Sequence, residues 1–209
     1  MSINKYVVEL IGTFFLVLTI GCTVIENGSA LLAPLAIGAA LMVMIFAGGH
    51  ISGGHYNPAV TLGVWMRGKC DTKDLVPYWL AQLIGAVLAA LIVKLLKSGS
   101  VVTPGNLQVL PALLAEFLFT FALVFVVLNV ATAKGTSGNS FYGLAIGMTV
   151  MTGAFAVGNI SGGAFNPAVA FGISIMGLSP WPSIWILLAG EILGGAVAAV
   201  TFKFVNPGD

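Results

Sequence analysis

The chain has 209 residues, of which 58% are apolar and only 7% are charged, and its mean hydropathy is +1.05. A water-exposed surface ordinarily has about a quarter to a third of charged residues, so this composition excludes a soluble globular domain and favours a membrane protein in a lipid bilayer. The net charge is +1, and without a basic stripe a nucleic-acid partner is excluded too.

Six apolar runs are long enough to cross a bilayer. At 1.5 Å of rise per residue, about 20 helical residues span the roughly 30 Å hydrocarbon core. The first run is too long for the apolar part of a signal peptide, so we expect it to remain as a membrane helix. The sequence therefore predicts six transmembrane helices, near residues 6–25, 32–50, 77–97, 112–131, 141–158 and 181–204.

The basic residues predict the orientation. An even number of crossings places both termini on one side, and six of the eight Lys and Arg residues fall on that side: Lys5, Arg67, Lys69, Lys73, Lys134 and Lys203. Only Lys94 and Lys97 fall on the other side. Because cytoplasmic loops carry the excess of basic residues, we expect cytoplasmic termini in a multi-pass protein of the cell membrane.

Two further segments, 51–68 and 160–178, are apolar but too short and too rich in glycine to cross the bilayer. Irregular backbone is tolerated at membrane depth only where protein buries it or where it lines a watery cavity. We expect re-entrant segments here, and with them a pore.

An internal repeat organises the chain. The sequences LAIG, ISGG and NPAV each occur twice, 109 residues apart, and the same offset relates Gln82 to Glu191, whereas Glu9 and Glu116 are 107 apart. The repeats, about 1–100 and 108–209, form one channel domain over 1–209. Each half contains three crossings, so the second half is inverted relative to the first, and the working site of such folds tends to lie near the midplane.

Each repeat contains one Asn-Pro-Ala triplet, namely Asn57-Pro58-Ala59 and Asn166-Pro167-Ala168. Asn is a favoured N-cap and Pro suits the first helical position, so half-helices are predicted from Pro58 to about Arg67 and from Pro167 to about Met176. Their N-terminal ends would meet at the midplane and make it electropositive, which repels cations while neutral solutes pass.

The segments before the triplets are glycine-rich and non-periodic, so regular structure cannot satisfy all their carbonyl groups. We expect those carbonyls to line the pore as a polar stripe, from Gly53, Gly54, His55, Ser161, Gly162 and Gly163.

These features resemble the aquaporin, or major intrinsic protein, family over essentially the whole chain. The resemblance rests on the paired triplets, on the segment from His50 to His55, on Glu9 and Glu116, and on Ala81-Gln82 with Gly85. It implies six tilted helices plus two half-helices, one pore per subunit, and a homotetramer that conducts water and small neutral solutes.

The resemblance also shows a departure. Family members normally carry Arg after the second triplet, where this chain has Val169, and the other constriction positions should be Ile37, Ala154 and Gly163. We expect a wide, apolar constriction that admits glycerol, urea or similar molecules. Glycerol channels of the family have Asp one position later, and Ala170 in its place argues against a dedicated glycerol facilitator.

Three acidic residues, Glu9, Glu116 and Glu191, fall within predicted membrane helices and require an explanation, because burying a charge in the membrane is costly. The resemblance suggests that Glu9 and Glu116 accept hydrogen bonds from the irregular loops; His50 is expected to anchor the first loop, and His55 to face the pore. Glu191 is expected to be a buried structural acceptor, with a pH-sensing or solute-contacting role as the alternative. No spacing indicates a metal or cofactor site.

Three other functional classes fit the sequence less well. No nucleophile-and-base arrangement or phosphate loop supports an enzyme. A secondary transporter shares the inverted repeat but would need a coupling-ion site with paired acids near the midplane. A poorly conducting junction or scaffold protein would need larger outer loops than this chain has.

Overall fold

The computed structural model describes residues 3–25 and 30–209, and within these ranges the chain is helical, without strands. Six helices are long: α1 Ile3–Val24, α2 Ala33–Ser52, α4 Thr72–Leu96, α5 Val109–Thr132, α6 Tyr142–Ser161 and α8 Ile184–Val205. Two are short, α3 Pro58–Met66 and α7 Pro167–Ile175. Single 3-10 turns lie at Ala30–Leu32, Lys134–Thr136 and Trp181–Ser183.

The predicted class, six membrane-spanning helices and two half-helices, is confirmed. The largest boundary error is at α4, which we expected to begin near Pro77 and which begins at Thr72. Hydropathy marks only the part of a helix that faces lipid, whereas α4 starts with a polar turn that contains Asp74 and continues through Pro77.

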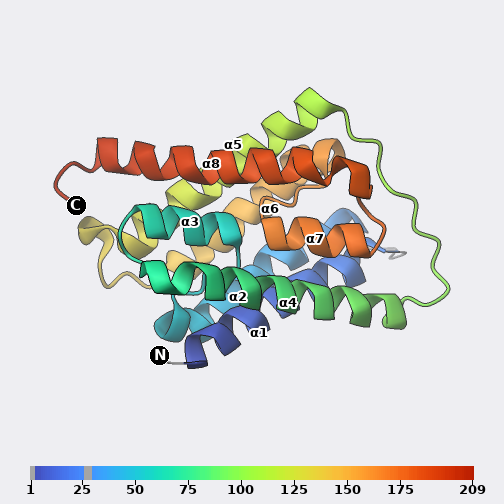
Figure 1. Ribbon diagram of the computed structural model, residues 1–209, viewed down its shortest axis with the longest axis horizontal. Coiled ribbons are helices and arrows are strands. Elements are labelled where there is room, and N and C mark those ends of the chain that lie inside the picture. The colour runs from blue at the N-terminus through green and yellow to red at the C-terminus, as the bar shows by residue number, and fades with distance from the viewer. Residues whose placement is uncertain (1–2, 26–29) are drawn as a thin grey trace.

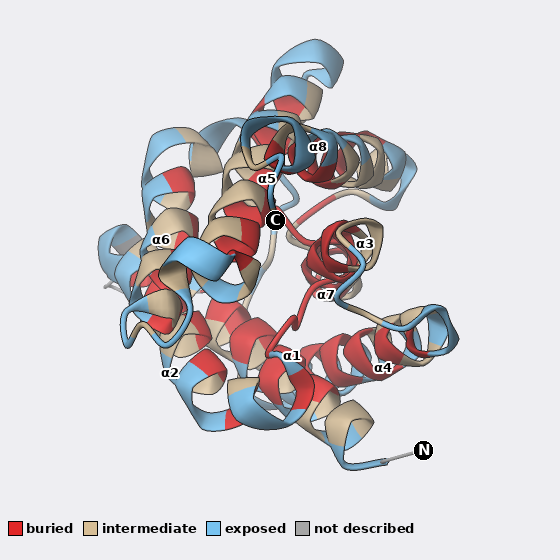
Figure 2. Ribbon diagram, turned by 90° about the vertical axis from the view of Figure 1, so that its left-hand side faces the viewer, coloured by how far each residue is buried: buried red, intermediate tan, exposed pale blue. Residues whose placement is uncertain are grey.

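The long helices form a bundle that encloses the short ones. α1 packs mainly on α4, α5 on α8, and α2 on α6. Figure 1 shows α3 and α7 end to end between α4 and α8. Seen along the bundle, buried residues face inward and exposed residues face outward (Figure 2). Many exposed residues are large and apolar, such as Phe15, Leu91 and Phe155, as expected for a lipid-facing surface.

Glycines set how closely the helices approach. A Cβ on Gly147 of α6 would lie 2.4 Å from the Gly38 carbonyl oxygen of α2, and a Cβ on Gly38 would lie 2.7 Å from that of Gly147. The two glycines are equivalent in the repeat. Gly143, Gly147, Gly190 and Gly194 all lie at close helix crossings, because a Cβ at any of them would come within 3.0 Å of a neighbouring helix.

We predict that Gly147→Ala destabilises the protein by about 1–3 kcal/mol, because the added methyl group would clash with the backbone of α2, which cannot move aside as a flexible side chain can. Gly158→Ala on the same helix is the matched control, since its Cβ would meet nothing within 4 Å. Thermal unfolding in detergent should show a lower Tm for Gly147→Ala alone. Equal melting temperatures would show that the crossing tolerates a methyl group.

Both ends of the chain lie at the same end of the bundle (Figure 1). Lys5 and Tyr6 bind the carboxylate of Asp74. Arg67, after α3, forms a 2.8 Å ion pair with Asp209, which also accepts a hydrogen bond from the Lys134 backbone N–H. The C-terminal residues therefore tie the end of α3 to the connection between α5 and α6.

Candidate functional site: a central passage beside the half-helices

Each half-helix begins at an asparagine that caps it. The Asn57 Oδ1 atom accepts a hydrogen bond from the Ala59 N–H at 2.8 Å, and the Asn166 Oδ1 atom accepts one from the Ala168 N–H at 3.0 Å. Proline follows each asparagine at the first helical position, where no N–H is needed. Both triplets thus start helices, and both helices start at the centre of the molecule.

The asparagines also join the two repeats. Asn57 Nδ2 donates to the Phe165 carbonyl oxygen, and Asn166 Nδ2 donates to the Tyr56 carbonyl oxygen, each at 2.8 Å. A carboxamide has two N–H groups, and one N–H on each asparagine is used in this way. The second N–H of each is available to a solute beside the junction.

Tyr56 and Phe165 hold the junction in a strained backbone conformation. Their φ angles are +49° and +48°, a region that bulky residues rarely adopt and that costs about 1–3 kcal/mol. Each has its N–H bound by a glutamate and its carbonyl bound by the other repeat's asparagine. The surrounding contacts therefore determine the conformation from both sides.

Glu9 of α1 organises the first loop. The carboxylate is fully buried and accepts four hydrogen bonds of 2.6–2.9 Å. The donors are the Ser52 hydroxyl, the backbone N–H groups of His55 and Tyr56, and the Gln82 side chain.

Glu116 of α5 has the equivalent place in the second repeat. It accepts from the Ser161 hydroxyl at 2.6 Å and from the backbone N–H groups of Ala164 and Phe165 at 3.1 and 2.6 Å. Ser161 is the last residue of α6, so its side chain serves this network.

The glutamates fix the direction of the loop carbonyls. In a trans peptide the N–H and C=O groups point in opposite directions. Because the N–H groups of His55 and Tyr56 point at Glu9, the carbonyls of Gly54 and His55 point away from it. The same reasoning turns the carbonyls of Gly163 and Ala164 away from Glu116.

These four residues line a narrow central passage. Its volume of about 20 Å³ is close to the roughly 10–15 Å³ minimum for one water molecule. Both Asn57 and Asn166 also line it. Loop carbonyls and asparagine side chains therefore form a polar strip along one wall.

The passage lies between two wide vestibules. The terminal vestibule, about 520 Å³, shares His55 and Val127 with the passage and is also lined by Lys5, Gly53 and Asp74. The distal vestibule, about 390 Å³, shares Ile20 and Ile37 with the passage and is also lined by Asn106, Gly162 and Leu178. The three cavities follow one another from one end of the bundle to the other.

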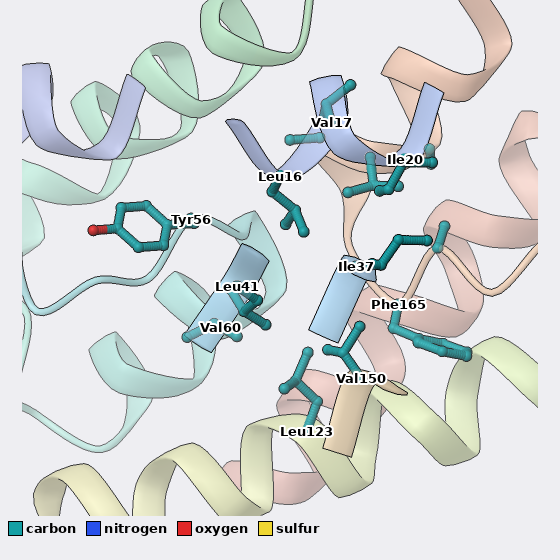
Figure 3. Close-up of a cluster of buried hydrophobic side chains, with 14 of the residues drawn as sticks. Leu16, Val17, Ile20, Ile37, Leu41, Tyr56, Val60, Leu123, Val150 and Phe165 are labelled. Carbon is teal, nitrogen blue, oxygen red and sulfur yellow. The ribbon is translucent and has the colours of Figure 1, made fainter. Parts of the chain in front are cut away.

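The wall opposite the polar strip is apolar. Side chains from α1, α2, α5 and α6 face one another there, and Tyr56 and Phe165 point away from them (Figure 3). Sequence reasoning missed the apolar side chains that are buried along the passage, namely Leu16, Ile20, Leu41, Val60, Leu123, Val127, Ile146 and Val150. At helical spacing, a pore-lining leucine cannot be distinguished from a core leucine by hydropathy.

The four expected constriction residues gather near the distal end. Gly163 and Val169 line the passage, Ile37 lines both the passage and the distal vestibule, and Ala154 lines the vestibule. None of the four has a charged or hydrogen-bonding side chain. The wide opening expected from the sequence is not observed, because the passage that three of them line is close to the size of one water. Ile20 lies beside them and, like Ile37, lines both the passage and the distal vestibule.

The two histidines have different surroundings. His55 is buried, its Nδ1 lies 3.1 Å from the Thr61 hydroxyl, and its ring packs against Tyr78. His50, expected to anchor the loop, lies exposed in the last turn of α2, and its side chain forms no hydrogen bond with the described part of the chain. The Tyr78 hydroxyl, which donates to the Ser52 carbonyl at 2.7 Å, fastens the end of α2 instead.

Glu191 of α8 is fully buried beside the second triplet. Its Oε1 accepts a hydrogen bond from the Asn166 backbone N–H at 3.1 Å. The side chain thus supports the residue that caps α7 without lining the passage.

Cys70 lines the terminal vestibule. Burial raises the pKa of its thiol to about 11, with Asp74 adding to the effect. The thiol is therefore neutral at physiological pH and a weak nucleophile.

The family model described as Major intrinsic protein matches residues 2–202. The chain is 35% identical to Aquaporin NIP1-1 of Zea mays, over 98% of this chain and 75% of the relative. It is also 35% identical to Glycerol uptake facilitator protein-like 6 of Lactiplantibacillus plantarum, over 99% and 100%.

Among solved structures, the aquaglyceroporin from Plasmodium falciparum superposes with a TM-score of 0.83 at 22% identity, covering 99% of this chain and 98% of that one. At this identity the likeness shows a shared fold.

Proposed function

The chain belongs to the major intrinsic protein family, whose members are passive channels and not enzymes, and from that premise we propose that its central passage conducts water in single file. The observation that carries the proposal is a water-sized passage between two open vestibules, with Asn57 and Asn166 beside it.

The polar strip explains how water would cross an apolar bundle. A water molecule that leaves a vestibule loses neighbouring waters, and the Gly54, His55, Gly163 and Ala164 carbonyls replace them as acceptors. At the midpoint the second N–H groups of the two asparagines donate to its oxygen. Because the half-helix N-termini make the centre electropositive, the passage disfavours protons and cations.

We propose that small neutral solutes such as urea, ammonia and glycerol also pass, with fluxes that fall as size increases. The constriction residues Ile37, Ala154, Gly163 and Val169 lack donors, so a polyol loses hydrogen bonds there without replacement. Passage of glycerol also requires Ile20 or Ile37 to change rotamer, since the passage is close to the size of one water.

The transporter alternative is less well supported. A coupling ion needs acids that it can reach, yet Glu9, Glu116 and Glu191 are fully buried, and Glu9 and Glu116 are bonded to the loops. A scaffold without conduction does not account for a polar-walled passage that adjoins both vestibules.

The assembly and location that we propose follow the family. The apolar outer surface suits lipid and neighbouring copies in a homotetramer, and the basic residues favour cytoplasmic termini in the cell membrane. Chemical cross-linking in membranes and protease access to a C-terminal tag would test these two proposals.

Proteoliposome measurements test the function. Stopped-flow swelling or shrinkage with water, urea, ammonia and glycerol gradients, together with a proton-leak control, should rank water first and glycerol last, without saturation or ion dependence. Flux that saturates or requires an ion would support the transporter. Permeability equal to that of protein-free liposomes would support the scaffold.

A further inference from the structure

Each repeat holds its loop through a buried glutamate, and the two glutamates differ in the number of hydrogen bonds that they accept. Glu9 accepts a hydroxyl, two backbone N–H groups and the Gln82 amide. Glu116 accepts the equivalent hydroxyl and two backbone N–H groups. The donor without an equivalent is the fourth one, the amide that binds Glu9 Oε2.

Glu191 occupies the position of that amide, because it is the repeat equivalent of Gln82. Glu116 and Glu191 lie side by side, since they accept hydrogen bonds from the successive backbone N–H groups of Phe165 and Asn166, and a Cβ on Gly190 would lie 2.9 Å from the Glu116 Cβ. Glu191 Oε1 is bound by Asn166, but its buried Oε2 receives no hydrogen bond from the described residues. Glu116 Oε2 thus accepts one hydrogen bond where Glu9 Oε2 accepts two, and Glu191 Oε2 is buried without a donor, which is costly.

A second difference between the repeats lies in the number of acceptors that surround Gln82 and Glu191. Gln82 Nε2 has two hydrogens, bound by Glu9 Oε2 at 2.8 Å and the Thr61 hydroxyl at 3.0 Å. The repeat equivalent of Thr61 is Ala170, which has no acceptor. A carboxylic acid has one O–H, and only one acceptor remains for it.

Among the described residues, no cationic side chain lies near Glu116 and Glu191 to balance the negative charges of two ionised carboxylates. The elements packed on α8 are α3, α5, α7 and Trp181–Ser183. Among them only α5 carries a titratable residue, Glu116, and the loop 162–166 carries none. Lys203 lies in the last turn of α8, far from Glu191, and Arg67 pairs with Asp209. Two adjacent buried carboxyls without a cation do not both ionise.

We propose that Glu191 is a protonated, neutral carboxylic acid whose O–H donates to Glu116 and whose carbonyl oxygen accepts from Asn166, so that it positions the second triplet as an uncharged equivalent of glutamine. Each repeat then has one negative charge, and Glu116, like Glu9, accepts four hydrogen bonds. Glu191 is a positioning residue in this scheme, since it acts on the passage through Asn166.

The proposal predicts a dependence on pH, which rests on the proposed water conduction. The folded protein holds the proton while an unfolded glutamate releases it, so raising the pH destabilises the folded state. An ionised Glu191 would repel the Glu116 carboxylate. This repulsion would weaken the hydrogen bonds through which the two glutamates hold the second loop. Water permeability and Tm should therefore fall at alkaline pH.

Infrared difference spectroscopy tests protonation without relying on flux. The wild type minus Glu191→Gln spectrum, recorded in lipid at neutral pH, should contain the C=O band of a protonated carboxyl, and this band should disappear at alkaline pH. If no such band is seen at neutral pH, Glu191 is ionised and the proposal is overturned, whether or not the protein conducts.

Two variants test the positioning role. Glu191→Gln leaves one amide hydrogen facing Ala170, so its Tm should fall, whereas Glu191→Gln with Ala170→Thr recreates the arrangement of the first repeat and should restore it. Permeability of the double variant should be insensitive to alkaline pH. The proposal fails if the double variant is no more stable than the single one, or if it keeps the wild-type pH profile. Absence of water flux in all three proteins would overturn the proposed function instead.

Discussion

Replacing Glu9 by alanine is expected to prevent the protein from folding into a stable channel. The substitution leaves four buried donors without an acceptor: the Ser52 hydroxyl, two backbone N–H groups and the Gln82 amide. At about 1–3 kcal/mol for each unpaired group, the sum rivals the whole stability of a typical domain, about 5–15 kcal/mol. The yield of monodisperse protein after detergent extraction and its Tm measure the effect.

Asp71→Ala is the matched control for this experiment. Asp71 is an exposed acid whose ion pair with Lys73 spans 3.1 Å between exposed side chains, and such pairs contribute about 0–1 kcal/mol. We expect near-normal yield and Tm for Asp71→Ala. A Glu9→Ala protein as stable as this control would show that water or rearranged backbone satisfies the loop without the acid.

Replacing Val169 by arginine is expected to have the largest effect on selectivity. Val169 is buried at the passage wall near the constriction, so the guanidinium would add charge and five N–H donors where none exist now. We predict that urea and glycerol fluxes fall by about tenfold or more while water flux changes by less than about threefold, because a bulky cation narrows the opening.

Val169→Leu separates size from charge, since it adds bulk without a donor. The leucine variant should reduce glycerol flux without changing proton leak, whereas the arginine variant should lower both. Solute fluxes that remain unchanged in both variants would show that a different residue, with Ile20 the first candidate, governs the opening.

Much of the architecture could be predicted because rigid sequence rules produce it. Asn57-Pro58 and Asn166-Pro167 begin their helices at the expected residues, since a capping side chain followed by proline has few other uses inside a membrane. The offset of 109 residues predicted a repeat, and the three crossings in each half predicted that the second half is inverted. Charge inside lipid is rare, so Glu9 and Glu116 were conspicuous before any contact was known.

The rest depends on three-dimensional contacts that have no local pattern. Leu16, Leu41 and Leu123 line the passage, yet in sequence they are leucines among many on apolar helices. The bonds from each asparagine to the other repeat's carbonyl join residues more than 100 positions apart.

Glu191 could be noticed as an acid at the position equivalent to Gln82, but its relation to Glu116 required the fold. The His50 expectation arose from proximity in sequence, whereas the last turn of α2 directs this side chain outward.

The most direct test of the central claim is an experimental density map of the protein in lipid, at a resolution that shows ordered water. We predict a continuous file of waters from the terminal vestibule to the distal vestibule, with one water hydrogen-bonded to both Asn57 and Asn166. A map in which side chains close the route beside these asparagines, with water on either side but none between, would contradict it.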